Sequence, residues 1–220
     1  YDISFLNSYF ESLSGFTTTG FSVIRDIQNL DEPLLIWRSS SQWLGGLFFL
    51  IATIGTLGNK AIKIKPTYLL STGNSGGNFY NNFNYNSFKV LLIYFLSTIF
   101  IIFLFNLSNI RLLDSFNLAF TTISSGGFLS KNSLSDIITH NTQALVLSFG
   151  LLFPIFNFYL IYKIVTKQFN FQEHQEDLHL GAIVILLTLL FYFFVIPNEG
   201  LANVVLAVTS SLSTSGIAMY

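Results

Sequence analysis

Apolar residues gather in four long runs along the chain, and polar residues gather between them. A helix that crosses a bilayer needs about 20 mostly apolar residues. The runs at 90–107 and 180–197 carry no charged residue, and the run at 144–165 carries one lysine near its end. The run at 43–57 is shorter and rich in small residues. We therefore predict four membrane-spanning helices over these ranges.

Three shorter apolar segments lie between or beside the predicted spans, at 3–16, 114–123 and 200–212. A helix rises 1.5 Å per residue, so segments of this length reach only about halfway through a bilayer. This length is typical of a re-entrant or interfacial helix rather than of a span. We therefore predict a half-helix at each of the three places.

The composition supports a membrane protein, since 51% of the residues are hydrophobic and only 10% are charged. Soluble domains are about 25% charged. The net charge of -1 gives no basic excess for nucleic acid. The absence of cysteine excludes disulfides and thiolate metal sites. The chain starts at Tyr1 without a signal peptide and ends inside a Ser/Thr tract, so we expect an excerpt of a longer protein.

The distribution of charge predicts which segments face the cytoplasm. Segment 59–89 holds four lysines and no acidic residue, so the positive-inside rule makes it cytoplasmic. Alternation of the spans places 166–179 on the same side. The remaining polar segments then face outward, with four basic and eight acidic residues. An acidic outer face would concentrate cations, although simple solvation of loops explains it equally well.

The three half-helices end in similar strings, which form an internal repeat. Each string is a hydroxyl-rich tract followed by glycine and an apolar residue. Gly20, Gly127 and Gly216 hold the glycine position, with Gly126 as an alternative in the second repeat. We choose Gly127 because an apolar residue follows it, as Phe21 follows Gly20. The strings are SGFTTTGF at 14–21, TTISSGGF at 121–128 and SSLSTSGI at 210–217.

Such tracts have the chemistry of a cation selectivity filter. Non-helical backbone at membrane depth survives only where it is buried or lines a watery cavity. Carbonyl and hydroxyl oxygens can replace the hydration shell of a monovalent cation, and the C-terminal end of a half-helix adds partial negative charge. Glycine allows backbone angles that let successive carbonyls converge. A ring needs about four tracts, so we expect a fourth outside this chain.

At this point the sequence resembles a known family. Three strings resemble the TrkH-like membrane subunit of Trk/Ktr potassium transporters. They are ESLSGFTTTGF at 11–21, WRS at 37–39 and QWLGG at 42–46. The string from Ala119 to Phe128 is similar to the second filter segment of that family, whereas STSGI at 213–217 is a generic string. The resemblance runs in order over essentially all 220 residues.

The resemblance implies an all-α membrane protein with four helix–pore-loop–helix repeats around a central cation pore, incomplete in this chain. On that pattern, 1–58 is the pore loop and inner helix of repeat 1. A cytoplasmic loop follows at 59–89, and 90–165 is repeat 2. Residues 166–179 form a second cytoplasmic loop, and 180–220 are the first helix and pore loop of repeat 3.

The resemblance also implies potassium uptake, with one key glycine in each filter segment. Relatives with serine at the first of these positions tend to admit sodium, so Gly20 implies a preference for potassium. No catalytic residue and no bound cofactor are expected, and potassium is the transported ligand. The implied filter residues are Thr18, Thr19, Gly20, Ser125, Gly126, Gly127, Thr214, Ser215 and Gly216.

The family further implies a multi-pass protein of the cell (inner) membrane, surrounded by lipid. Its members associate with a cytoplasmic nucleotide-binding subunit of the TrkA/KtrA type and form homodimers. Two alternatives stay open: a sodium-permeable or non-conducting membrane relative, and a polytopic membrane enzyme. An enzyme would need ionisable residues within the spans, and the sequence has none away from their ends. Channel-like transport and transport coupled to protons or sodium both stay open.

Overall fold

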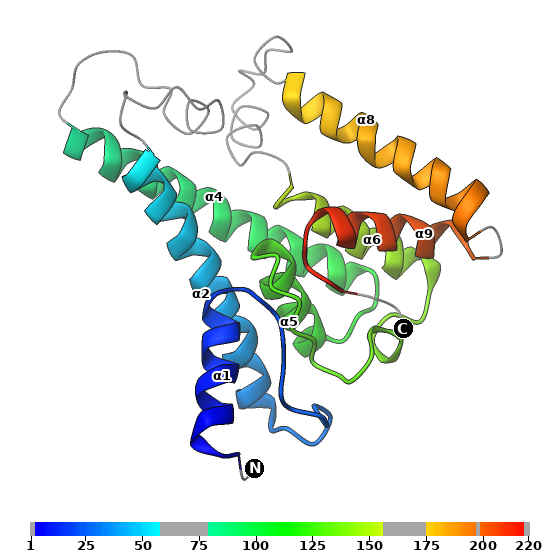
Figure 1. Ribbon diagram of the computed structural model, residues 1–220, viewed down its shortest axis with the longest axis horizontal. Helices are drawn as coiled ribbons and strands as arrows, with labels where there is room; N and C mark the ends of the chain where they lie inside the picture. The colour runs from blue at the N-terminus through cyan, green and yellow to red at the C-terminus, as the bar shows by residue number, and fades with distance from the viewer. Residues whose placement is uncertain (1–2, 58–78, 156–174, 197–198, 218–220) are drawn as a thin grey trace.

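A computed structural model describes residues 3–57, 79–155, 175–196 and 199–217. Within these ranges the chain is helical and contains no β-strand, as predicted (Figure 1). The α-helices with their bounds are α1 (Phe5–Phe16), α2 (Glu32–Leu57), α4 (Phe79–Leu107), α5 (Leu112–Ile123), α6 (Asn141–Leu152), α8 (Gln175–Leu190) and α9 (Leu201–Leu212). Two short elements complete the set, the 3-10 turn η1 (Leu134–Asp136) and the π-helical turn η3 (Phe191–Val195).

The half-helices α1, α5 and α9 each pack against long helices. α1 lies against α2, α5 lies between α2 and α4, and α9 lies against α6 and α8 (Figure 1). Each half-helix has 12 residues and ends where the sequence predicts, at Phe16, Ile123 and Leu212. The loop that follows each of them therefore starts from a similar place in its repeat.

One apolar core joins repeat 2 to α9. Ile101 and Phe105 of α4, Leu118 of α5, Leu147 of α6 and Leu206 of α9 are almost completely buried in it. These side chains come from helices that are far apart in the sequence. The core therefore fixes the second and third half-helices relative to one another, and with them the tracts that follow.

Several long helices begin earlier than the apolar pattern predicts. α2 begins at Glu32 rather than 43, α4 at Phe79 rather than 90, and α8 at Gln175 rather than 180. The starts of α4 and α8 thus lie in segments expected as cytoplasmic loops, because a helix can continue past the apolar part of its sequence. Arg38, expected in an outer loop, lies inside α2 and is buried, since an acidic partner neutralises it.

Two described helices are long and apolar enough to cross a membrane by length and composition, Ser87–Leu107 and Asp177–Val195. Ile185, Leu186 and Phe194 on the second are exposed, which suits contact with lipid or with another helix. α2 contains the predicted span 43–57 and has 26 residues, but it is not among the two helices that are both long and apolar enough. Within the fourth, at 144–165, residues 156–165 lie outside the described part of the chain.

Candidate functional site

The half-helices α1 and α5 end in the same type of turn. After α1, the amide of Thr18 donates to the carbonyl of Gly15, and the amide of Thr19 donates to that of Ser14, both at 3.0 Å. This pair of bonds defines a Schellman turn, which uses two of the last helix carbonyls internally. The oxygens left for an ion therefore come mainly from the tract itself. The equivalent amide–carbonyl pairs after α5 are Ser125–Thr122 at 3.2 Å and Gly126–Thr121 at 2.9 Å.

The residue after each helix cap adopts a left-handed backbone conformation, although none of the three is glycine. Thr18, Ser125 and Thr214 have φ of 56°, 55° and 57°. Residues with a Cβ atom adopt this region at a cost of roughly 1–2 kcal/mol. The same strained angle in all three repeats indicates that the turn is a repeated structural feature of the tracts. Such strain, which the surrounding structure must offset, concentrates at functional sites.

The glycine two residues later is left-handed as well. Gly20, Gly127 and Gly216 have φ of 80°, 83° and 65°. Gly126 is not among the described residues with positive φ, so the backbone aligns Gly127 with Gly20. In each tract, one left-handed residue precedes and one follows a central residue, which is Thr19, Gly126 or Ser215. This alternation repeatedly changes the direction of the peptide groups, as a filter lined by carbonyl oxygens requires.

The three tracts lie directly against one another. A Cβ atom added to Gly20 would be 2.2 Å from the carbonyl oxygen of Gly126, and one added to Gly127 would be 2.2 Å from that of Ser215. The central carbonyl of one tract therefore occupies the place of a side chain in the preceding tract. No described atom lies within 4 Å of the corresponding Cβ position at Gly216. That side of the third tract is open to a further neighbour.

Gln42 of α2 supports the second tract from behind. Its side chain is completely buried, and its Nε2 donates to the carbonyl of Gly126 at 2.6 Å. Its Oε1 accepts from the hydroxyl of Thr121 at 2.9 Å and from the amide of Phe128 at 3.2 Å. A Cβ atom on Gly126 would lie 2.4 Å from Cδ of Gln42. Gly126 is therefore required for packing alone, whereas Gly127 is required both for packing and for its backbone angle.

Hydroxyl groups support the other two tracts. The Ser14 hydroxyl donates to the carbonyl of Phe21 at 2.6 Å and so joins the end of α1 to the end of the first tract. In the third repeat, the Ser213 hydroxyl lies 3.0 Å from Ser215 Oγ and 3.1 Å from the carbonyl of Ser210. The three tracts share their backbone geometry but differ in the side chains that hold them.

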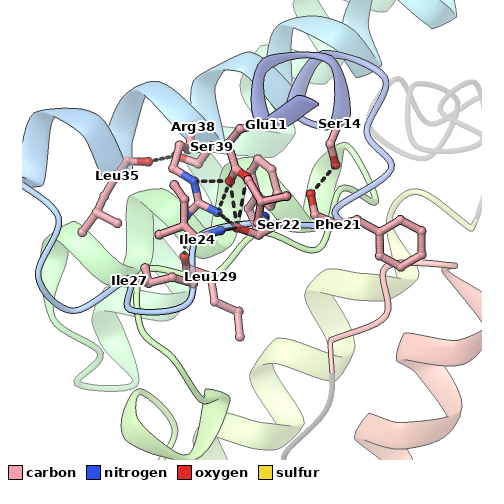
Figure 2. A network of polar contacts seen from close by, with 12 residues as sticks. Glu11, Ser14, Phe21, Ser22, Ile24, Ile27, Leu35, Arg38, Ser39 and Leu129 are labelled. Atoms are coloured by element: carbon pink, nitrogen blue, oxygen red, sulfur yellow. Dashed lines mark hydrogen bonds and ion pairs between the residues drawn. The ribbon is translucent and has the colours of Figure 1, made fainter. Parts of the chain in front are cut away.

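A buried ion pair lies beside the first tract (Figure 2). Nη2 and Nε of Arg38 donate to Oε1 of Glu11 at 2.7 and 2.9 Å, and both residues are less than one-tenth exposed. The sequence left open whether Glu11 faces the outer vestibule or pairs with Arg38, and the structure shows the pair. The second repeat has its own buried carboxylate, Asp114 in the first turn of α5, which accepts from the hydroxyl of Ser130 in the following loop at 2.6 Å.

The oxygens of the tracts are backbone carbonyls and hydroxyls, and the tracts contain no ionisable side chain. Among the described residues there is no group of three or more His, Cys, Asp or Glu side chains that could hold a metal ion. An ion at these tracts would therefore be held by neutral oxygens. Neutral oxygens can replace the water around a monovalent cation without binding it too tightly to leave.

The sequence offered pairing with Arg38 as one of two alternatives for Glu11 and assigned no role to Gln42, although both Arg38 and Gln42 lie in strings that carry the family resemblance. The available signal was their spacing, since a charged and an amide side chain four residues apart share one face of a helix. Polar side chains on one face of a membrane helix point to a protein-facing surface.

Comparison with known proteins gives relatives of one kind, although no family model matches the chain. It is 30% identical to an uncharacterized cation transporter of Methanocaldococcus jannaschii, over 76% of this chain and 35% of that protein. It is 26% identical to the potassium uptake protein TrkG of Escherichia coli, with the same two coverages. The crystal structure of the potassium transporter TrkH from Vibrio parahaemolyticus superposes with a TM-score of 0.76 at 21% identity. That match covers 100% of this chain and 46% of the TrkH chain, so this chain spans a third to a half of the relatives it matches.

Proposed function

Because this chain belongs to the family of Trk-type cation transport proteins, we propose that it is part of an ion-translocating membrane subunit for potassium uptake. Its fold is that of the TrkH membrane transporter, and its relatives of known function are transporters. The observation that carries the proposal is the mutual contact of the three tracts through Gly20 and Gly127. Three unrelated Ser/Thr loops would have no reason to share left-handed angles and to meet at their glycines.

The ion path runs, on this proposal, past the oxygens of the three tracts. The repeats supply equivalent sets of residues, and the ring closes with a further tract beside Gly216, where described atoms leave space. Potassium is the favoured ion because Gly20 holds the position at which sodium-admitting relatives tend to carry serine. The filter residues are Thr18, Thr19, Gly20, Ser125, Gly126, Gly127, Thr214, Ser215 and Gly216.

We place the protein in the cell (inner) membrane as a multi-pass subunit. The proposal includes two partners by family analogy. One is a cytoplasmic nucleotide-binding subunit of the TrkA/KtrA type, which would meet the cytoplasmic segments 59–89 and 166–179. The other is a second copy, because exposed apolar side chains on α1 and α8 leave area for contact as well as for lipid. No catalytic group or bound cofactor is part of the proposal.

The decisive experiment measures rubidium uptake in a bacterium that lacks its own potassium uptake systems. The complete gene that contains this sequence is expressed, with and without a co-expressed nucleotide-binding subunit, and sodium is added as competitor. Uptake that resists excess sodium supports potassium translocation. Uptake that sodium abolishes identifies a sodium-permeable relative. No uptake under either condition, with the protein present in the membrane, identifies the non-conducting alternative.

A single substitution tests whether the tracts form the ion path. Replacing Gly127 by Asp puts a side chain where the Ser215 carbonyl lies and adds a charge beside it. We expect Gly127→Asp to abolish rubidium uptake. Undiminished uptake by this variant would contradict the filter assignment, whatever ion the wild-type protein prefers.

A further inference from the structure

We propose that the buried pair Glu11–Arg38 determines ion selectivity by holding the outer ends of the first and second tracts at a fixed separation. The inference rests on the proposed function, because selectivity presupposes an ion path along the tracts. Neither side chain belongs to a tract. Both act through the segments that leave the tracts, so they are positioning residues.

Glu11 binds the segment that follows the first tract. Its Oε2 accepts from the amide of Val23 at 3.0 Å and from the Ser22 hydroxyl at 3.1 Å, while Oε1 accepts from the same hydroxyl at 2.9 Å. Ser22 lies two residues after Gly20. Nη2 of Arg38 also donates to this hydroxyl, at 3.1 Å, so Ser22 lies between the two charges (Figure 2).

Arg38 reaches the segment that follows the second tract. Its guanidinium lies 4.2 Å from the ring centroid of Phe128, within cation–π range. Its Nη1 also lies 3.5 Å from the carbonyl oxygen of Leu129. Phe128 comes directly after Gly127. One guanidinium therefore contacts the exits of both tracts, and Figure 2 shows it with Leu129 and Ser22 around it.

Gln42 lies one helical turn further along α2 and binds the second tract through Gly126. The two tracts are thus attached to one face of one helix, the first through Glu11 and Ser22 and the second through Gln42 and Phe128. Since the Gly126 carbonyl fills the Cβ position of Gly20, a small shift between the attachments changes the contact between the tracts.

Stability alone does not require a charged pair at this place. A buried ion pair is often replaceable by apolar residues without loss of stability, because desolvation opposes the attraction. A fixed guanidinium and carboxylate instead supply directional bonds to several backbone segments at once. Sodium is smaller than potassium, so its oxygens must come closer together. A rigid attachment that resists this contraction of the tracts disfavours sodium binding more than potassium binding.

The test compares three variants in the complete gene, Arg38→Gln, Glu11→Gln and Ser22→Ala, by the sodium concentration that halves rubidium uptake. Ser22→Ala removes the shared hydroxyl without changing any charge. Arg111→Gln is the matched control, because Arg111 pairs with Glu32 on the same outer side, and both side chains are about 60% exposed. It removes the same charge without touching a tract.

We expect Arg38→Gln and Glu11→Gln to lower the half-inhibiting sodium concentration about tenfold, Ser22→Ala to lower it by a smaller factor, and Arg111→Gln to leave it within about twofold. We expect rubidium uptake without sodium, normalised to the amount of protein in the membrane, to fall by a smaller factor than the half-inhibiting sodium concentration. If neither Arg38→Gln nor Glu11→Gln reaches the membrane, Ser22→Ala decides alone.

Two results would overturn the inference. One is wild-type sodium inhibition in Ser22→Ala and in whichever charge variants reach the membrane, which assigns the pair to helix docking only. The other is an equal shift in Arg111→Gln, which assigns the effect to net charge. Failure of the proposed function is distinguishable from both, because the wild-type protein itself would then take up no rubidium, and the inference would fall with it.

Discussion

Gly20 and Gly127 each lie where the carbonyl oxygen of a neighbouring tract occupies the position of a side chain. Two independent requirements apply at each of these glycines. φ is about 80°, and a carbonyl oxygen of the neighbouring tract occupies the space of a Cβ atom. Either requirement alone would favour glycine. At Gly126 only the second applies, since Gln42 fills its Cβ position. The pair Gly126–Gly127 therefore contains two glycines with different functions.

Replacing Gly20 by Ser tests the first tract. The added Cβ atom would meet the Gly126 carbonyl at 2.2 Å, so the tract must shift and its oxygens lose their common geometry. We expect the preference for rubidium over sodium to fall, as measured by competitive uptake. Gly181→Ser in α8 is the control, because no described atom lies within 4 Å of its Cβ position. Unchanged preference in Gly20→Ser would contradict the role of Gly20.

Replacing Gln42 by Leu tests the support behind the second tract. The change leaves the Thr121 hydroxyl, the Phe128 amide and the Gly126 carbonyl without their partner. Each buried polar group left unpaired costs about 1–3 kcal/mol. We expect a clearly lower thermal midpoint of the purified protein in detergent. Gln28→Leu, an exposed glutamine on the outer loop, should change the midpoint little, and equal midpoints for both variants would argue against the support role.

At the scale of elements, α2 organises the site. It contacts α1, α4 and α5, and its polar face carries Arg38 and Gln42 to two different tracts. Close approach to α1 depends on Gly45, because a Cβ atom there would lie 1.8 Å from the carbonyl oxygen of Phe16. Small residues at such contacts let membrane helices pack closely. Phe16 is the last residue of α1, so this contact fixes where the first tract begins.

Gly45→Ala tests this helix contact. The methyl group would overlap backbone rather than a movable side chain, so α1 must move away from α2. We expect destabilisation at or above the usual overpacking range of about 1–3 kcal/mol, measured as a loss of thermal midpoint in detergent. Gly181→Ala provides the comparison, because its Cβ position is open in the described structure. A wild-type midpoint for Gly45→Ala would show that α1 docks less closely.

At the scale of the whole molecule, the repeats place three half-helices and three tracts around one point, with the outer loops beyond them. The absence of cysteine allows the orientation of this arrangement to be tested directly. Ser135 is exposed within η1, on the side that the charge pattern places outside. Lys63 belongs to the segment predicted to be cytoplasmic.

We expect a membrane-impermeant maleimide to label Ser135→Cys in intact cells and to label Lys63→Cys only after the cells are opened. The protein without either substitution supplies the background, since these 220 residues contain no thiol. Labelling of Lys63→Cys in intact cells, with Ser135→Cys protected, would reverse the proposed orientation. It would also move the acidic loops to the cytoplasmic side.

Features that depend on local order were predictable from the pattern of residues along the chain. The length of the apolar runs predicted the half-helices and their ends, since the apolar face that a helix buries is set by its own residues. Repetition of hydroxyl residues before glycine identified the tracts, and the apolar residue after Gly127 indicated the same alignment as the backbone angles. The left-handed turns at Thr18, Ser125 and Thr214 were not readable, because residues with a Cβ atom seldom adopt them.

The contacts that hold the tracts become visible in the three-dimensional fold alone. Gln42 meets Gly126 across 84 positions of sequence, and Arg38 meets Glu11 across 27. Local patterns do not select such partners, so Arg38 was expected in an outer loop and its pairing with Glu11 stayed one of two alternatives. The structure instead places Arg38 inside α2, which begins at Glu32. The local sequence specifies the chemistry of the tracts, whereas the spacing between the tracts depends on contacts between distant segments.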